Sequence, residues 1–135
     1  MPLLSRVFIR LGLLHLLAAL LLAGWMVVTP SSGVWRPVFY HLFIVGWIFQ
    51  LIIGVAYWMF PKLNKATPRG DTAAMWSVLV FLNLGLWLRV IGEPLGVLNA
   101  EALGIASLLM VVSAILQWLA GVGFVYAIWG RVKER

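Results

Sequence analysis

The sequence lacks cysteine and has few charged residues. Without cysteine there can be no disulfide, thiolate metal site, iron–sulfur cluster or C-x-x-C-H attachment of c-type haem. Only 10% of the 135 residues are charged and 64% are hydrophobic, whereas about one quarter of the residues in soluble domains are charged. A single domain of this length cannot bury so much apolar surface in water. We therefore predict that the lipid bilayer is its solvent.

Several functional motifs are also missing. The sequence has no Walker loop, Rossmann glycine pattern or H-E-x-x-H. Its net charge of +6 does not indicate a nucleic-acid partner, because the basic residues lie at the ends of apolar runs and do not line one amphipathic face. The segments between these runs are too short for a soluble catalytic domain. Any chemistry must therefore use side chains inside the membrane.

Long apolar runs dominate what remains. A helix of about 20 apolar residues crosses a hydrocarbon core of roughly 30 Å. The predicted spans of this single transmembrane domain are Val7–Val28, Val38–Phe60, Ala73–Ile91 and Ala102–Trp129. Turn-forming residues separate them, with Gly92-Glu93-Pro94 ending the third, and Asp71 and Asn99 are predicted N-caps. The predicted fold is an all-α, integral membrane four-helix bundle.

Lysine and arginine predict the orientation of this bundle. Cytoplasmic segments carry an excess of these residues. Eight of them would lie on one side of the membrane: Arg6, Arg10, Lys62, Lys65, Arg69, Arg131, Lys133 and Arg135. Only Arg36 and Arg89 fall on the other side. We therefore expect a multi-pass protein of the inner (cytoplasmic) cell membrane with both ends in the cytoplasm.

Few polar residues lie within the predicted spans. They are His15, His41, Gln50, Asn83, Arg89 and Gln117, with Glu93 just beyond the third span. Polar groups are costly in lipid and usually face a partner, a cavity or a cofactor. Gly46, Gln50 and Gly54 recur every four residues, which is typical of a helix-packing seam. Arg89 and Glu93 could form an i,i+4 pair if the helix continues to Pro94.

The two histidines are the candidate ligands. Neutral imidazole is the commonest ligand of haem iron and metals in such surroundings. A single membrane histidine is more often a hydrogen-bonding contact between helices than a ligand. Residue type alone leaves both interpretations open.

The segment His41–Pro61 resembles the second helix of the catalytic subunits of haem-copper oxidases and nitric-oxide reductases. It opens with His41 near the outer surface, continues with small residues, and closes with Tyr57 and Pro61. The family's histidine at this position is an axial ligand of the low-spin haem. The resemblance therefore implies haem b, with His41 as the ligand of its iron. Other cofactor-binding residues would be His15, Arg89 for the propionates, and Trp47 and Trp87 as pocket walls.

The chain departs from the family in its histidines. The second haem ligand and the copper ligands of the family lie on later helices, and this chain has only 2 histidines. A complete haem-copper site cannot be assembled from one copy. We do not expect the chain to be an enzyme by itself.

The two histidines are predicted to lie at different depths. Helix rise places His15 about 12 Å from the inner edge and His41 about 5 Å from the outer edge, a gap of about 13 Å. One upright haem fits this pair poorly. His41 could instead meet His41 of a second copy across a two-fold axis. It could also be the sole ligand of a five-coordinate iron that binds a diatomic gas.

The leading hypothesis is a homo-oligomeric haem-b protein for electron transfer or gas binding. The alternative is a haem-free structural or assembly subunit of a respiratory membrane complex, which would need only the packing seam and the basic ends. A transporter ranks third, because the spans lack the acidic residues that cation pathways usually carry.

Overall fold

The computed structural model describes residues 1–29, 32–65 and 67–132, and these residues form a helical bundle. The first long helix is α1 (Leu3–Val28). The second, Gly33–Met59, is built from η1 (Ser32–Trp35), α2 (Arg36–Tyr40), η2 (His41–Phe49) and α3 (Gln50–Met59). The third is α4 (Thr72–Leu98), and η3 (Ala100–Ala102) leads into α5 (Leu103–Trp129). All four are long and apolar enough to cross a membrane. The predicted all-α, four-helix membrane fold is confirmed.

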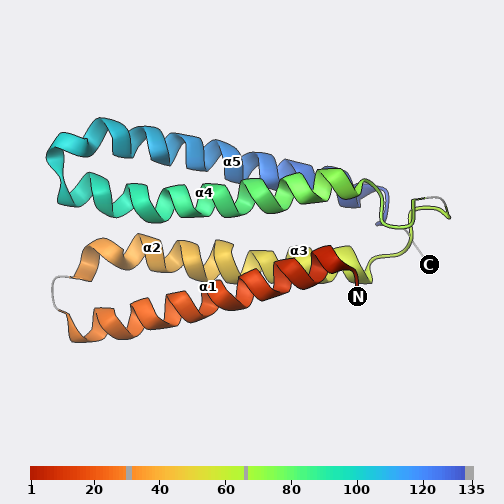
Figure 1. Ribbon diagram of the computed structural model, residues 1–135, viewed down its shortest axis with the longest axis horizontal. Coiled ribbons are helices and arrows are strands. Elements are labelled where there is room, and N and C mark those ends of the chain that lie inside the picture. The colour runs from red at the N-terminus through yellow and green to blue at the C-terminus, as the bar shows by residue number, and fades with distance from the viewer. Residues whose placement is uncertain (30–31, 66, 133–135) are drawn as a thin grey trace.

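The bundle consists of two helical hairpins. The second long helix packs on α1, and α5 packs along α4, as Figure 1 shows. The hairpins meet where α4 lies against α2 and η2. The start of α1, the connection between α3 and α4, and the end of α5 all lie at one end of the bundle (Figure 1). The basic residues predicted to be cytoplasmic belong to these segments, although Lys133 and Arg135 lie outside the described residues.

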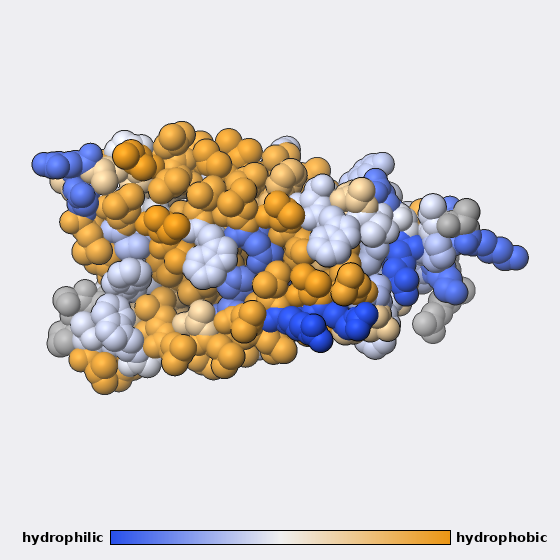
Figure 2. Space-filling model, viewed as in Figure 1, coloured by the Kyte–Doolittle hydropathy of each residue, from blue (hydrophilic) through white to orange (hydrophobic). Residues whose placement is uncertain are grey.

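Apolar side chains cover the outside of the bundle. In Figure 2 hydrophobic residues occupy most of the visible face, and hydrophilic residues gather at the end that holds the α3–α4 connection. Helix α5 is the most exposed of the four, with only Ala106, Ser113, Ala120 and Ile128 buried. Such a surface is stable only when lipid covers it. The chain is therefore a multi-pass membrane protein.

Glycines bring α1 and the second long helix together. A Cβ atom added at Gly46 would lie 2.8 Å from the Cβ of His15, and one added at Gly54 would lie 2.9 Å from the Cβ of Phe8. Between these glycines, buried Gln50 turns to the other hairpin and donates a hydrogen bond to Asn83 of α4 (2.7 Å). The predicted packing seam is confirmed.

Helix α4 corrects one predicted boundary. The predicted end at Ile91 is wrong, because α4 continues through Gly92, Glu93 and Pro94 to Leu98. A proline inside a helix removes one backbone donor. Here Gly92 packs closely on Leu109 of α5 and Glu93 forms contacts with other helices, so tertiary packing overrides the local turn signal.

The predicted cap of the third helix is present, whereas Asn99, predicted to cap the fourth, caps the short helix η3 before it. The Oδ1 atom of Asp71 accepts hydrogen bonds from the backbone N–H groups of Ala73 (2.8 Å) and Ala74 (3.1 Å). The Oδ1 atom of Asn99 accepts from Glu101 (3.0 Å) and so caps η3, which leads into α5. Both residues satisfy backbone donors that have no partner in the first turn.

Candidate functional site

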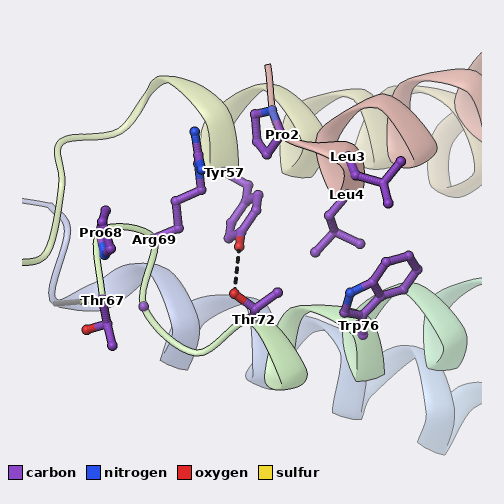
Figure 3. Close-up of a pocket in the computed structure, with 10 residues that line it drawn as sticks. Pro2, Leu3, Leu4, Tyr57, Thr67, Pro68, Arg69, Thr72 and Trp76 are labelled. Atoms are coloured by element: carbon purple, nitrogen blue, oxygen red, sulfur yellow. Dashed lines mark hydrogen bonds between the residues drawn. The ribbon is translucent and has the colours of Figure 1, made fainter.

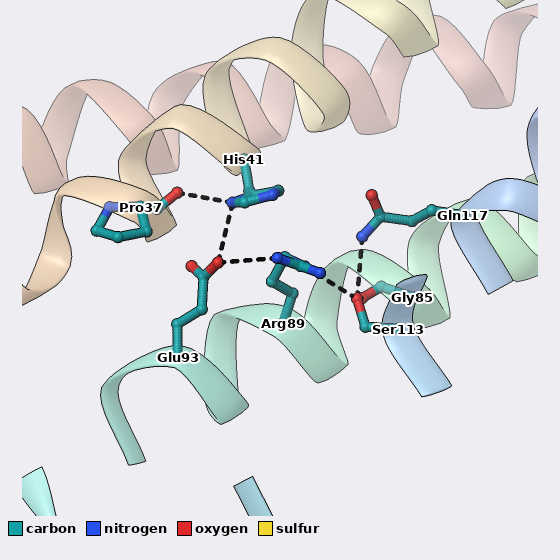
Figure 4. A network of polar contacts seen from close by, with 7 residues as sticks. All are labelled: Pro37, His41, Gly85, Arg89, Glu93, Ser113 and Gln117. Atoms are coloured by element: carbon teal, nitrogen blue, oxygen red, sulfur yellow. Dashed lines mark hydrogen bonds and ion pairs between the residues drawn. The ribbon is translucent and has the colours of Figure 1, made fainter. Parts of the chain in front are cut away.

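His41 is the first residue of η2, where the helix widens into the π form. Single π turns inside α-helices occur frequently at functional sites. The Nδ1 atom of His41 lies 2.8 Å from the carbonyl oxygen of Pro37 and 3.3 Å from Oε1 of Glu93 (Figure 4). Both neighbours are acceptors, so in the neutral ring Nδ1 carries the hydrogen and Nε2 keeps its lone pair.

Glu93 connects His41 to the second hairpin. Its Oε1 atom also accepts a hydrogen bond from Nη1 of Arg89, one helical turn earlier on α4, at 3.2 Å. The Glu93 side chain is only 10% exposed. One carboxylate oxygen therefore faces an imidazole N–H and a guanidinium from two different helices, which offsets part of the cost of removing the charge from water. The buried Oε2 atom has no hydrogen-bond partner among the described residues.

Ser113 of α5 continues this chain of contacts. Its hydroxyl donates to the carbonyl oxygen of Gly85 (2.6 Å) and accepts hydrogen bonds from Nε of Arg89 (3.3 Å) and from Nε2 of Gln117 (3.0 Å). Ser113 is fully buried. The set His41, Glu93, Arg89, Ser113 and Gln117, which we call the polar network, links three of the four long helices (Figure 4).

His15 and Trp87 lie together, but outside the polar network. His15 is buried against Gly46, and its ring centroid lies 5.9 Å from that of Trp87. Because Gly46 is five residues from His41 in the sequence, the two histidines differ in depth by about 7 Å instead of the predicted 13 Å or so. They still face different neighbours, since His41 contacts Pro37 and Glu93.

Trp47 has a third environment. Its ring packs edge-on against Phe43, with centroids 4.8 Å apart, and its buried Nε1 has no hydrogen-bond partner among the described residues. Of the predicted site residues, the structure thus joins His41 and Arg89 through Glu93, pairs His15 with Trp87, and leaves Trp47 beside Phe43.

Sequence reasoning missed one member of the polar network and one of its contacts. The contact of Glu93 with His41 was not predicted, although the spacing of Arg89 and Glu93 predicted the other contact of this carboxylate. Ser113 gave no signal, because one serine in an apolar helix is ordinary. Gln117 was named as a polar residue of the fourth span, and its hydrogen bond to Ser113 lies within α5.

Replacing Glu93 with leucine should destabilise the protein, because the charge of Arg89 then has no carboxylate partner inside the bundle. We expect a loss of about 2 kcal/mol in the free energy of unfolding, somewhat below the value for a fully buried pair because Arg89 is partly exposed. Denaturant unfolding in detergent measures it. The double variant Arg89→Leu/Glu93→Leu should recover most of the loss. Equal stability of the single variant and the parent protein would show that the pair is not coupled.

A separate cavity lies at the other end of the bundle. Its volume is about 460 Å³, and its walls include Leu4, Tyr57 and Trp76 (Figure 3). The hydroxyl of Tyr57 lies 3.4 Å from that of Thr72 across this space. Arg69 extends along the same wall as Tyr57 (Figure 3). The cavity offers hydrogen-bonding groups and one cation, but no histidine or carboxylate lines it.

The described residues contain no cluster of three or more histidine, cysteine, aspartate or glutamate side chains that could hold a metal ion. No family model matches the sequence, and no curated protein or solved structure matches it significantly.

Proposed function

We propose that this membrane protein binds haem b through Nε2 of His41 and serves in electron transfer or diatomic gas binding. The observation that carries the proposal is the contact of Nδ1 with the Pro37 carbonyl and the Glu93 carboxylate. Histidines that ligate metals almost always donate their other ring N–H to such an acceptor, which fixes the tautomer and raises the basicity of the ligating nitrogen. The imidazole is also 26% exposed, so a ligand can reach it.

The surroundings of His41 favour a haem on the outward side of the bundle. The imidazole is partly exposed, whereas the helix contact five residues further on, at Gly46, is closely packed against His15 and Leu86. The carboxylate of Glu93 contacts both Arg89 and His41. Within the described residues Nη2 of Arg89 makes no hydrogen bond, so it can receive a haem propionate, for which guanidinium is well shaped.

The second axial ligand would come from another copy. The chain has only 2 histidines, and His15 is buried away from His41, beside Gly46 and Trp87. A two-fold axis along the membrane normal would bring His41 of a second protomer to the same depth. When bound in this way, haem supplies an iron that exchanges one electron, while the chain holds the iron and sets the hydrogen bond behind its ligand.

The visible spectrum of the full chain tests the proposal. The protein would be purified in detergent after expression with added haem, and spectra recorded oxidised and dithionite-reduced. We expect a Soret band, sharp reduced α and β bands and one haem per two chains. A broad reduced spectrum that shifts with carbon monoxide, at one haem per chain, would indicate His41 as the sole ligand. A colourless protein would overturn the haem proposal.

One observation favours a second candidate, the haem-free structural subunit of a respiratory membrane complex. The polar network already gives His41 and Arg89 hydrogen-bond partners without any ligand, as a purely structural cluster would. The outward face of α5, with exposed Trp118, Tyr126 and Trp129, would then contact neighbouring subunits. A colourless protein that is lost from membranes when the other subunits are absent would support this function.

A further inference from the structure

Arg131 links the end of α5 to the end of α3, two segments that are far apart in the sequence. It lies two residues after the end of α5 and is 1% exposed. Its Nη2 donates to the carbonyl oxygens of Tyr57 (2.9 Å) and Phe60 (2.8 Å), and its Nε donates to that of Pro61 (3.0 Å). The carbonyl of Tyr57 needs such a donor, because the residue four positions later is Pro61, which has no N–H.

The guanidinium is nevertheless only partly satisfied. Its Nη1 is buried and has no hydrogen-bond partner among the described residues. The positive centre also lies 5.4 Å from the ring centroid of Tyr57, and no salt bridge within the described part of the chain involves it. Burial lowers the pKa of Arg131, and the positive charge of Arg69 lowers it further against the opposing effect of Tyr57. A nearby anion would relieve both costs.

Arg131 lines a cavity of about 360 Å³ at this end of the bundle. Lys62 and Arg69 line it too, and neither forms a salt bridge with any described residue. No carboxylate is among the lining residues. Asp71, two residues after Arg69, already caps α4 with its Oδ1 atom. Among the described residues, the cavity is therefore lined by three cations and by no counter-ion.

We infer that this cavity binds a phosphate group, and that the group belongs to the headgroup of an anionic phospholipid. Arginine and lysine are the residues that bind phosphate in proteins. The rim favours a lipid over a phosphate from solution, because Trp58 and Phe60 also line the cavity and are 47% and 37% exposed. Such aromatic side chains lie at the membrane–water interface, and basic pockets on the cytoplasmic side of membrane proteins bind anionic headgroups.

The test compares lipid binding by the full chain and two charge variants in detergent micelles. Lys62→Gln/Arg69→Gln removes two exposed cations of the cavity and leaves Arg131 in place. Lys65→Gln/Arg6→Gln is the matched control, since it removes the same charge at the same end from residues that do not line the cavity. Phosphatidylglycerol, phosphatidylcholine and inorganic phosphate are titrated separately. Thermal unfolding and native mass spectrometry measure binding, and helicity without lipid verifies folding.

We expect phosphatidylglycerol, but not phosphatidylcholine, to stabilise the parent protein and the control. The cavity variant should bind it at least about tenfold more weakly, as expected for the loss of one or two charge-assisted contacts. If inorganic phosphate stabilises the protein as well as the lipid does, the inference that the phosphate group belongs to a lipid is wrong. Equal weakening in both variants would mean unspecific attraction to a basic surface and would overturn the site, as would equal binding of both lipids. None of these outcomes depends on haem.

Discussion

Replacing His41 with alanine is expected to abolish the Soret band of the protein prepared with haem. The imidazole supplies the only nitrogen that the polar network leaves free to ligate an iron, because its Nδ1 is held by Pro37 and Glu93. Changes to hydrogen-bonding partners behind a ligand already cost about 10–100-fold in metal affinity. Loss of the ligand itself should therefore weaken haem binding by at least about 100-fold, as measured by titration of the apoprotein in detergent.

His15→Gln is the matched control for this experiment. Histidine 15 is buried, and glutamine retains a polar side chain of similar length at the contact with Gly46. We expect this variant to keep the spectrum of the parent protein, because His15 contacts neither Glu93 nor Pro37. If His15→Gln lost the spectrum and His41→Ala retained it, the ligand would lie on α1, and its assignment to His41 would be wrong. Helicity of both variants, measured by circular dichroism, distinguishes loss of haem from loss of fold.

Replacing Gly46 with leucine should cause the largest loss of stability. The added Cβ atom would lie 2.8 Å from Cβ of His15 and 3.0 Å from Cδ2 of Leu86, and the remaining side chain would have to separate α1 from the second long helix. Overpacking a core costs up to about 3 kcal/mol, which corresponds to more than 100-fold in the folding equilibrium. Denaturant unfolding in detergent measures this loss.

Gly24→Leu provides the comparison, since it makes the same substitution within α1 at a position where an added Cβ meets nothing within 4 Å. We expect its stability to stay within about 0.5 kcal/mol of the parent protein. Similar losses in both variants would mean that helix propensity or lipid contact, and not the close approach at Gly46, determines the effect. That outcome would contradict the packing seam as the contact that holds the first hairpin together.

The features that depend on residues close together in the sequence were predictable. Four apolar runs specify four helices because lipid leaves the backbone no other partner for its polar groups. Asp71 was recognised as a cap, since a cap bonds only two or three residues ahead. The seam of Gly46 and Gly54 follows from the helical repeat, which places residues four apart on one face. In each case the structure confirms the prediction.

The prediction failed where a distant residue changes the outcome. Gly92-Glu93-Pro94 has the composition of a turn, and the helix was therefore predicted to end at Ile91. In the structure, packing on α5 and the contacts of Glu93 carry α4 through the proline to Leu98. The role of Arg131 was missed for the same reason. It was counted as a charge that sets orientation, although it bonds carbonyl groups about 70 positions earlier.

The sequence by itself determined that the chain is a membrane protein, how many long helices it has, and that most of its basic residues lie at one end of the bundle. Each of these depends on properties summed along the chain, namely apolar length and the distribution of lysine and arginine. Only the tertiary structure decided which polar groups meet: His41 with Glu93, Ser113 with Gly85, and Arg131 with the end of α3. The physical reason is that a polar group in lipid must find its partner wherever the helices cross, and the crossing is a property of the packed bundle.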